Sequence, residues 1–200
     1  MRLFNKRSEL PPEVQKRVPP GQYLTEKWPV LHYGPIPPFD AKRWDFRVWG
    51  EVASEVRLAW EEFQRLDRTQ VTADMHCVTT WSKLDQKWEG IPLRRIVDLA
   101  KPRPSARFVI AHCEYGFTAN VPIEATRDDN VLIALRANGA PLTPEHGYPA
   151  RLVIPKLYAW KSAKWLRGLE FAATDKPGFW ERNGYHNTGD PWKEERYWGD

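Results

Sequence analysis

The stretch EHGYPARLVIPKLYAWKSAKWLRGLEF, residues 145–171, combines apolar runs with regularly spaced cations. The runs ARLVIP (150–155) and KWLRGLEFAA (164–173) predict two strands. Arginine can hold a phosphate with two parallel hydrogen bonds, and lysine adds a point charge. The segment therefore predicts an anion-binding pocket beside a sheet, although a solvated basic strand pair would explain the same pattern. Its cations are Arg151, Lys156, Lys161, Lys164 and Arg167.

Two small residues within this stretch favour the pocket. Gly147 allows another part of the chain, or a ligand, to approach the backbone closely. Ser162 contributes a hydroxyl group and a turn amide, which are common elements of anion-binding concavities.

The whole chain has the composition of an ordinary globular protein. It contains 200 residues, 42% of them hydrophobic and 28% charged, with a net charge of +4. This length suffices for one domain whose core needs no disulfide or structural metal. Residues 1–20 are charged and broken by prolines, without the apolar centre of a secretory signal. We therefore expect a cytoplasmic protein.

The pattern of apolar residues predicts many short strands and few helices. Strands are predicted over 46–52, 56–60, 106–113, 117–121, 150–155 and 164–173. Residues 70–80 predict a strand that runs into a loop, residues 83–90 a polar strand or hairpin arm, and residues 131–139 a strand that enters a turn. Helices are predicted over 61–66 and 92–100, and a helical turn over 123–128. Prolines and glycines in the tail, residues 184–200, argue against a helix there. Residues 1–40 show little periodicity and predict an extended arm, whereas residues 41–200 predict one domain.

Cys77, in the stretch DMHCVTTWS (74–82), is one of only two cysteines. A small buried core residue, a soft metal ligand and an attacking thiolate are all compatible with this local context. A zinc site is disfavoured, because His76-Cys77 and His112-Cys113 are adjacent pairs whose members point to opposite faces of a strand. A catalytic histidine for Cys77 is not indicated by any spacing. The candidates for that role are His32, His112, His146 and His186.

Four motifs, in order along the chain, resemble segments of the sulfite oxidase family of molybdenum enzymes. They are CVTTWS, WEGIPLRRIVDLAKP, ANGAPLTPEHGYPARLVIP and HGYPARLVIPKLYAWKSAKWL. The resemblance extends from about residue 28 to the end. It implies an α+β fold of the sulfite-oxidase type with mixed short-stranded sheets, and a molybdenum held by one molybdopterin and by Cys77.

The resemblance also implies roles for individual residues. Cys77 would be the catalytic metal ligand, and Cys113 would line the pocket. His32 and Tyr33 of the arm would belong to the pterin-binding segment, so that the arm would contribute to the cofactor site. His146 and Arg151 would hold the pterin and its phosphate. The phosphate end would be wrapped by Lys161, Ser162, Ala163 and Lys164.

The reaction implied is two-electron oxygen-atom transfer, in which the metal cycles between Mo(VI) and Mo(IV). Several positions differ from those of sulfite oxidases. Where sulfite oxidases have a substrate-binding arginine, this chain has Leu31, and where they have a tyrosine near the metal, it has Leu135. The Gly-Asn-Arg run that follows their cysteine is replaced by Thr79-Thr80-Trp81. Because these changes remove the charge that would hold sulfite, we expect a small uncharged substrate such as a sulfoxide or N-oxide. Trp81, Trp88, Trp160 and Trp165 would either pack around the cofactor or form an apolar substrate funnel.

The chain also resembles the periplasmic methionine-sulfoxide-reducing branch of the family, which shares the Cys-x3-Trp-Ser spacing. It has no Cys-x-x-Cys-His haem motif. Because no haem site is indicated, we expect a separate electron-transfer partner. We also expect a small-molecule substrate, and no binding to nucleic acid or membrane. We expect molybdopterin in its plain mononucleotide form, without an added nucleotide. The alternative is a cofactor-free or nucleic-acid-binding module on the same fold.

Overall fold

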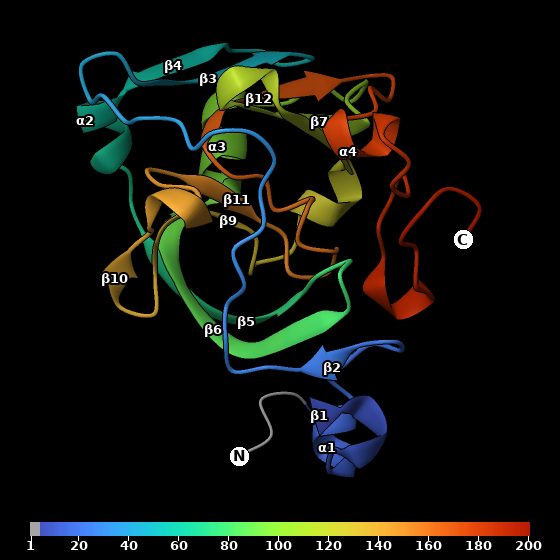
Figure 1. Ribbon diagram of the computed structural model, residues 1–200. Coiled ribbons are helices and arrows are strands. Elements are labelled where there is room, and N and C mark those ends of the chain that lie inside the picture. The colour runs from blue at the N-terminus through green and yellow to red at the C-terminus, as the bar shows by residue number, and fades with distance from the viewer. Residues whose placement is uncertain (1–4) are drawn as a thin grey trace.

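The computed structural model describes residues 5–200, which form two β-sheets connected by loops and short helices (Figure 1). The larger sheet has the strand order β1-β2-β6-β9-β10, with β5 added on β6 and β11 added on β9. Its strands are β1 (Asn5–Lys6), β2 (Tyr23–Leu24), β5 (Thr69–His76), β6 (Trp81–Pro92), β9 (Leu132–Ala137), β10 (Ala140–Pro141) and β11 (Arg151–Val153).

The second sheet has the order β4-β3-β12-β7-β8. Its central strand, β12, runs parallel to β3 and antiparallel to β7. Most of its strands begin or end within two residues of the predicted boundaries. They are β3 (Asp45–Gly50), β4 (Val56–Ala59), β7 (Phe108–Cys113), β8 (Thr118–Pro122) and β12 (Leu166–Ala172).

The helices are short, which confirms the predicted α+β class. The longest among residues 5–200 is α3 (Leu93–Ala100). The others are α1 (Pro12–Gln15), α2 (Trp60–Gln64) and α4 (Phe179–Arg182), together with the 3₁₀ turns η1 (Arg7–Glu9), η2 (Glu114–Gly116), η3 (Ile123–Thr126), η4 (Pro144–His146) and η5 (Pro191–Lys193). No helix of this part of the chain is long and apolar enough to cross a bilayer.

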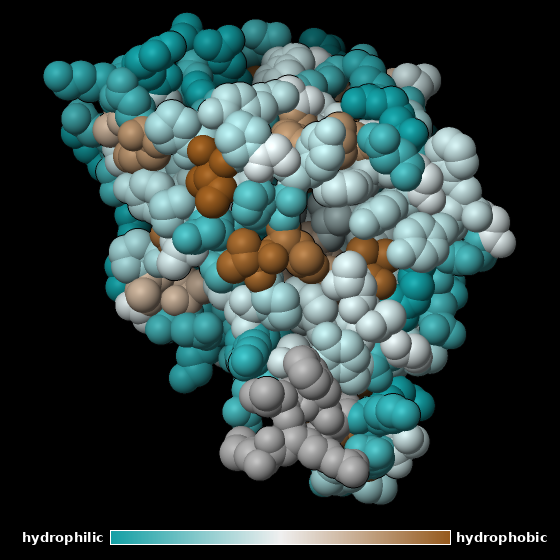
Figure 2. All heavy atoms as spheres, in the orientation of Figure 1, coloured by the Kyte–Doolittle hydropathy of each residue, from teal (hydrophilic) through white to brown (hydrophobic). Residues whose placement is uncertain are grey.

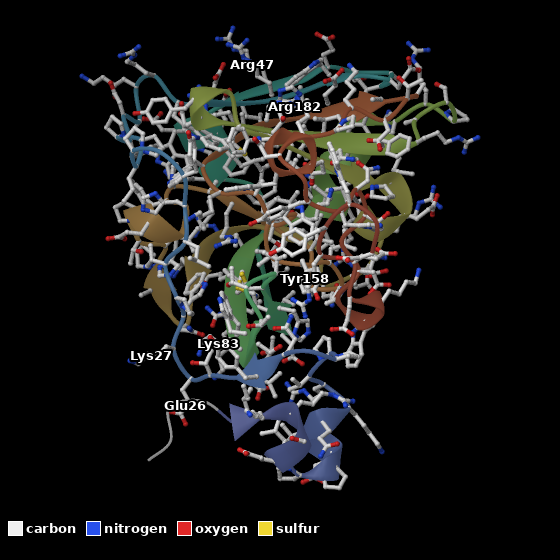
Figure 3. The ribbon with its side chains drawn as sticks, turned by 45° about the vertical axis from the view of Figure 1, so that its right-hand side comes forward. Glu26, Lys27, Arg47, Lys83, Tyr158 and Arg182 are labelled. Carbon is white, nitrogen blue, oxygen red and sulfur yellow. The ribbon has the colours of Figure 1, made fainter. Side chains whose placement is uncertain are left out.

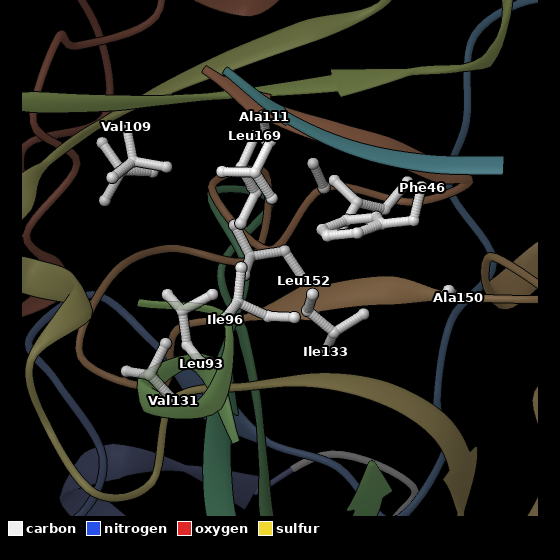
Figure 4. Close-up of a cluster of buried hydrophobic side chains, with 14 of the residues drawn as sticks. Phe46, Leu93, Ile96, Val109, Ala111, Val131, Ile133, Ala150, Leu152 and Leu169 are labelled. Atoms are coloured by element: carbon white, nitrogen blue, oxygen red, sulfur yellow. The ribbon is translucent and has the colours of Figure 1, made fainter. Parts of the chain in front are cut away.

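The main core lies between the two sheets and α3 (Figure 4). Leu93, Ile96 and Ala100 repeat at helical spacing, so α3 buries one face against the sheets. Phe46 and Leu169 face them from the second sheet, and none of these five side chains is accessible to solvent. This core fixes the relative position of the strand ends and loops that carry the predicted site residues.

The structure refines one predicted element and corrects another. The strand that was predicted to run into a loop within residues 70–80 ends at His76, because residues 77–80 form a tight turn that connects β5 to β6. The prediction that the tail contains no helix is wrong for the single turn η5, which Asp190 begins by accepting a hydrogen bond from the Trp192 amide at 2.9 Å. A short polar side chain before a proline is a good start for such a turn.

Residues 1–40 were predicted to form an arm; residues 1–4 of it lie outside the described residues. The remainder follows the domain, and β2 pairs with the start of β6 through Tyr23 and Trp81. Lys83 donates a 2.8 Å hydrogen bond to the carbonyl of Glu26, close to where the arm crosses β6 (Figure 3). The arm, blue in Figure 1, then continues over the front of the molecule.

Candidate functional site

A cavity of about 250 Å³ opens between the arm, the β5–β6 turn and the loop before β12. This volume lies just below the usual range for ligand pockets, roughly 300–1,000 Å³. In Figure 2, brown and pale side chains gather around the hollowed centre of the face that the arm crosses. Nine predicted site residues line the cavity: His32, Tyr33, Cys77, Cys113, His146, Arg151, Ser162, Ala163 and Lys164.

Cys77 is the first residue of the turn between β5 and β6. Its amide donates to the Trp81 carbonyl at 2.9 Å, and Thr80 donates back to the Cys77 carbonyl at 3.0 Å. Gln22 of the arm donates to the same carbonyl at 3.0 Å. The turn therefore holds the thiol at a defined position in the wall of the cavity.

The Cys77 sulfur is buried and accepts a 3.2 Å hydrogen bond from the Thr79 hydroxyl. Burial raises the pKa of the thiol above its ordinary value, and Thr79 partly opposes that rise. No histidine in residues 5–200 is hydrogen-bonded to this sulfur, although His32 and His146 line the cavity. A protein thiolate of this kind becomes favourable when a metal cation binds it.

The neighbouring histidines turn away from the cavity. His76 points to the other side of β5 and pairs with the Ser82 hydroxyl at 2.8 Å, and burial lowers its pKa to about 4. His112 pairs with Glu170 at 3.1 Å. Across residues 5–200 no group of three or more His, Cys, Asp or Glu side chains is placed to hold a metal ion. A metal on Cys77 would thus take its other ligands from a bound group.

Arg151 is a buried cation without an acidic partner among the described residues. Its Nη1 donates to the His146 carbonyl at 3.1 Å and its Nη2 to the Ser162 carbonyl at 2.8 Å. The Nε atom is buried without a partner. Burial lowers the pKa of Arg151 to about 10. Because an uncompensated buried charge is costly, this arrangement favours an anionic ligand in the cavity.

Trp28 of the arm joins Arg151 to His146. The guanidinium lies over the Trp28 ring at 5.7 Å and over Trp88 at 5.5 Å. The His146 ring stacks on Trp28 with centroids 3.7 Å apart, and its Nδ1 shares a 2.9 Å hydrogen bond with the Thr143 hydroxyl. The Nε2 atom of His146 is buried without a partner. Burial and Arg151 lower the pKa of His146, so a neutral imidazole is available to a polar ligand atom.

Lys164 ties the arm to the cavity wall. Its ammonium donates to the Leu31 carbonyl at 2.6 Å and to the Glu145 carbonyl at 2.8 Å. Burial and the neighbouring Arg151 lower its pKa to about 7. Lys164 and Arg151 therefore concentrate positive charge at this end of the cavity.

Ser162, Ala163 and Cys113 contribute in other ways. The Ser162 hydroxyl accepts a 2.9 Å hydrogen bond from the Ile154 amide, so it fixes the loop after β11. Cys113, at the end of β7, is buried, and this burial raises its pKa to about 12. It lines the cavity as a protonated thiol.

Lys161 is the one predicted site residue that does not line the cavity. Its side chain is completely buried on the opposite side of the loop, where its ammonium lies 2.5 Å from Glu181. His186, a possible partner of Cys77, is absent from the cavity lining as well. Its Nδ1 accepts hydrogen bonds from the amides of Thr188 and Gly189 at 3.1 and 3.2 Å, which organise the tail.

Aromatic residues form much of the remaining lining. Trp81, Trp160 and Trp165 reach the cavity, whereas Trp88 packs beneath Arg151. Leu31 and Thr79 also line it, whereas Leu135 belongs to the main core. The sequence analysis gave no role in the site to ten further lining residues, among them Trp28, Met75, Phe117, Trp180 and Tyr185.

The residues present fit a molybdenum–pterin group. They provide one soft sulfur donor, a buried cation that needs an anion, and two buried nitrogen atoms without partners, on Arg151 and His146. Thiolate is a suitable ligand for soft transition metals. This combination fits a group that carries both a metal and an anionic, hydrogen-bonding body.

Comparisons with known proteins agree with this chemistry. The family model described as "Oxidoreductase molybdopterin binding domain" matches residues 33–180. The chain is 46% identical over 182 residues to "Uncharacterized oxidoreductase YuiH" of Bacillus subtilis (strain 168), covering 90% of this chain and 92% of that protein.

More distant relatives have assigned activities. The chain is 26% identical over 160 residues to the catalytic subunit of the protein-methionine-sulfoxide reductase MsrP of Campylobacter jejuni, covering 72% of this chain and 54% of the relative. The sulfane dehydrogenase SoxCD of Paracoccus pantotrophus shares the fold, with a TM-score of 0.66 and 21% identity over 88% of this chain and 55% of that one. The chain thus spans only about half of each of these two proteins.

Proposed function

Because the chain belongs to the family of oxidoreductases with a molybdopterin-binding domain, we propose that Cys77 ligates molybdenum and that the enzyme transfers an oxygen atom to or from a small uncharged substrate. Family membership confirms the predicted molybdopterin-dependent oxidoreductase and the sulfite-oxidase-type α+β fold. The substrate class, the plain mononucleotide form of the cofactor and the individual residue roles are parts of this proposal.

One observation carries the proposal most directly: the Cys77 thiol and Arg151, whose guanidinium has no acidic partner among the described residues and a buried Nε without a hydrogen bond, line the same cavity. A thiol alone would be compatible with a core position. A buried cation alone would be compatible with any small anion. Together they require a ligand with a thiophilic end and an anionic or strongly polar body.

When bound, the molybdenum–pterin group supplies two-electron oxygen-atom transfer, and the chain supplies position and solvent exclusion. Cys77 would ligate the metal as the thiolate, with Thr79 still donating to its sulfur. Arg151 would donate from its free Nε, and His146 would offer its Nε2. Lys164 and the backbone around Ser162 and Ala163 would hold the phosphate.

The arm would close the site from outside. His32 donates from Nδ1 to the Gly34 carbonyl at 3.0 Å, which leaves its other nitrogen free. Tyr33 packs against Phe179 with ring centroids 5.4 Å apart. Since both residues also line the cavity, they would cover the pterin where the arm passes over it.

The substrate side favours an uncharged molecule. Leu31, Thr79 and Trp160 line it together with Trp180 and Tyr185, and none of these side chains is ionised at neutral pH. The cations of the cavity would be used by the cofactor. A sulfoxide or N-oxide fits this lining better than sulfite does, and the sulfoxide-reducing relative supports that choice.

Electrons would be exchanged with a separate electron-transfer protein, and a cytoplasmic location and the absence of nucleic-acid and membrane binding remain predictions. The small cavity supports the mononucleotide form. The alternative of a nucleic-acid-binding module is less well supported, because Arg151 and Lys161 are buried and would not reach a polyanion outside.

The test uses protein produced in a host that synthesises molybdopterin. We expect about one molybdenum atom per chain in the wild type and in Cys113→Ala, and loss of the metal in Cys77→Ala. With a reduced viologen dye as electron donor, we expect turnover of dimethyl sulfoxide or trimethylamine N-oxide. Wild-type protein without molybdenum or pterin under these conditions would refute the cofactor assignment. Oxidation of sulfite in preference to these reactions would refute the substrate class.

A further inference from the structure

Lys161 lies directly behind the aromatic side of the cavity. Its ammonium donates to the Asn120 carbonyl at 2.8 Å, the Asn120 side-chain oxygen at 2.9 Å and the Asn187 carbonyl at 2.6 Å. It also forms the 2.5 Å ion pair with Glu181. With these acceptors, and with no solvent-accessible surface, the ammonium has no donor left for a ligand in the cavity.

We propose that Lys161 is a positioning residue for the substrate side of the cavity, acting through Glu181 and Trp160, and that its side chain does not contact the cofactor. This role deepens the proposed function, on which its effect on substrate binding rests. Its structural part, the orientation of Trp160, does not depend on the substrate.

Glu181 transmits the effect of Lys161 to the cavity. Its Oε1 accepts a 2.8 Å hydrogen bond from the indole Nε1 of Trp160, and the Trp160 ring lines the cavity. Glu181 is 2% exposed, so its carboxylate needs a cation to remain charged there. Lys161 provides that cation and thereby keeps a strong acceptor aimed at the indole.

The same contact fixes α4 and the residues that follow it. Trp180 and Tyr185 stack with centroids 5.0 Å apart, and Tyr185 meets the edge of Trp160 at 5.1 Å. These three rings, which we call the aromatic wall, all line the cavity. Because Glu181 lies between Trp180 and Tyr185 in the chain, an anchor at Glu181 sets the position of the whole aromatic wall.

Behind the aromatic wall the backbone packs so closely that two glycine positions have no room for a larger residue. A Cβ at Gly178 would lie 2.5 Å from the Thr118 carbonyl and 2.5 Å from Glu181. A Cβ at Gly189 would lie 2.7 Å from the Trp160 ring. The chain therefore approaches Glu181 and Trp160 so closely that a shift of either would move the lining of the cavity.

The experiment compares three variants of the holoenzyme. Lys161→Met alone would leave a buried carboxylate without its cation, so the variant used is K161M combined with E181Q, whose amide oxygen still accepts from Trp160. K161M combined with E181L removes that acceptor. Lys164→Met, on the cofactor side of the same loop, is the comparison for cofactor loss.

Three quantities are measured: molybdenum and pterin per chain, hydrogen exchange of the Trp160 indole N–H by NMR, and the kinetics of dimethyl sulfoxide and methyl phenyl sulfoxide reduction. For K161M/E181Q we expect cofactor content within about twofold of the wild type, because the Lys161 side chain is fully buried and does not line the cavity. For K161M/E181L we expect indole exchange at least about tenfold faster. We also expect KM about tenfold higher with little change in kcat, since binding rather than the chemical step is affected.

The outcomes separate the inference from the proposed function. Loss of cofactor in K161M/E181Q to the extent seen in Lys164→Met would overturn it, since Lys161 would then act at the cofactor. Unchanged indole exchange in K161M/E181L would overturn it too. Should that variant not fold, Trp160→Phe removes only the indole donor, and an unchanged KM there would count against the aromatic wall. If the wild type reduces no sulfoxide, the substrate proposal fails, while cofactor content and indole exchange still decide the role of Lys161.

Discussion

The carbonyl oxygen of Val78 accepts a 2.8 Å hydrogen bond from Nη1 of Arg196, which joins the cysteine turn to the C-terminal tail. The same guanidinium donates to the Pro20 carbonyl at 3.3 Å and lies over the ring of Tyr158 at 5.1 Å. Arg196 therefore holds the arm, the tail and the turn with Cys77 in one arrangement.

We expect Arg196→Met to lower the free energy of unfolding of the apo-protein by about 1.5–3 kcal/mol, the usual contribution of hydrogen bonds from a charged group. The Cys77 turn would be held less firmly, so molybdenum per chain should fall as well. Urea denaturation and metal analysis measure the two effects.

Lys193→Met is the matched control in the same tail. The Lys193 side chain is 69% exposed and its nearest carboxylates are 3.8 and 4.0 Å away, so little change is expected. Equal effects of both substitutions, or full stability of Arg196→Met, would show that Arg196 does not hold the turn.

Arg151 should matter more for cofactor retention than for folding. In Arg151→Met the carbonyls of His146 and Ser162 lose a donor, but a buried cation without an acidic partner is also removed. These opposing effects should keep the change in unfolding free energy of the apo-protein below about 2 kcal/mol. Molybdenum and pterin per chain should fall severalfold, as measured on purified holoenzyme.

Arg136→Met provides the comparison, because Arg136 is a partly exposed residue of β9 that pairs with Glu89 at 3.5 Å outside the cavity. Its cofactor content should match that of the wild type. Full cofactor content in Arg151→Met would contradict the role assigned to the buried guanidinium.

Local sequence patterns predicted most of the secondary structure, because the strands are short runs rich in apolar and β-branched residues and α3 repeats its apolar residues at helical spacing. They failed where long-range contacts decide the local conformation. Residues 70–80 were predicted to be a strand that runs into a loop, but the β-branched residues Val78, Thr79 and Thr80 gave no sign of the tight turn, in which the Thr80 backbone has φ of 73° and presents Cys77. A β-branched residue rarely adopts this conformation alone, so the pattern could not have indicated it.

The cations and cysteines of the site could be predicted because the sequence places them in one basic, glycine-containing stretch and in recognisable motifs. The direction in which each side chain points could not be predicted. Lys161 and Lys164 are three positions apart in a loop, without a regular period, and one faces Glu181 while the other faces the cavity. Trp28, Trp180 and Tyr185 come from the arm, α4 and the tail. The arm and the tail fold back over the domain through tertiary contacts such as those of Arg196.

Gly147 is predicted to be necessary for the spacing of the two cavity cations. Its φ is +106°, and a Cβ there would lie 3.0 Å from the Lys164 Cβ and 3.2 Å from the Arg151 Cβ. Gly147→Ala should therefore cost backbone strain of about 1–2 kcal/mol and, in addition, displace both side chains and reduce cofactor content. Thermal denaturation and metal analysis measure these effects.

Gly139→Ala separates strain from crowding, because Gly139 has a φ of +80° but an added Cβ would meet nothing within 4 Å. Gly139→Ala should be destabilised by the same backbone strain, but its cofactor content should match that of the wild type. Equal molybdenum content in the two variants would show that the close approach at Gly147 has no effect on the site.

The pH dependence of the apo-protein should report the partly buried amine of Lys164. Its pKa is lowered from 10.5 to about 7 in the folded state, so between these values the unfolded chain binds the proton that the folded chain has released. The free energy of unfolding should thus rise as pH increases from 7 toward 10.5. Below pH 7 the folded protein should be destabilised by the full cost of keeping the Lys164 ammonium charged in its partly buried position. Because the amine is partly exposed and bonded to two carbonyls, we expect a contribution on the order of 1 kcal/mol.

Urea denaturation at several pH values, compared with Lys164→Met, measures this contribution as the difference between the two pH profiles. The variant should lack the rise. In holoenzyme the rise should be smaller than in the apo-protein, because a phosphate beside Lys164 favours the charged amine and returns its pKa toward the ordinary value. Identical pH profiles for the apo wild type and Lys164→Met would show that the amine is solvated rather than buried. A profile unchanged by the cofactor would place the phosphate away from Lys164.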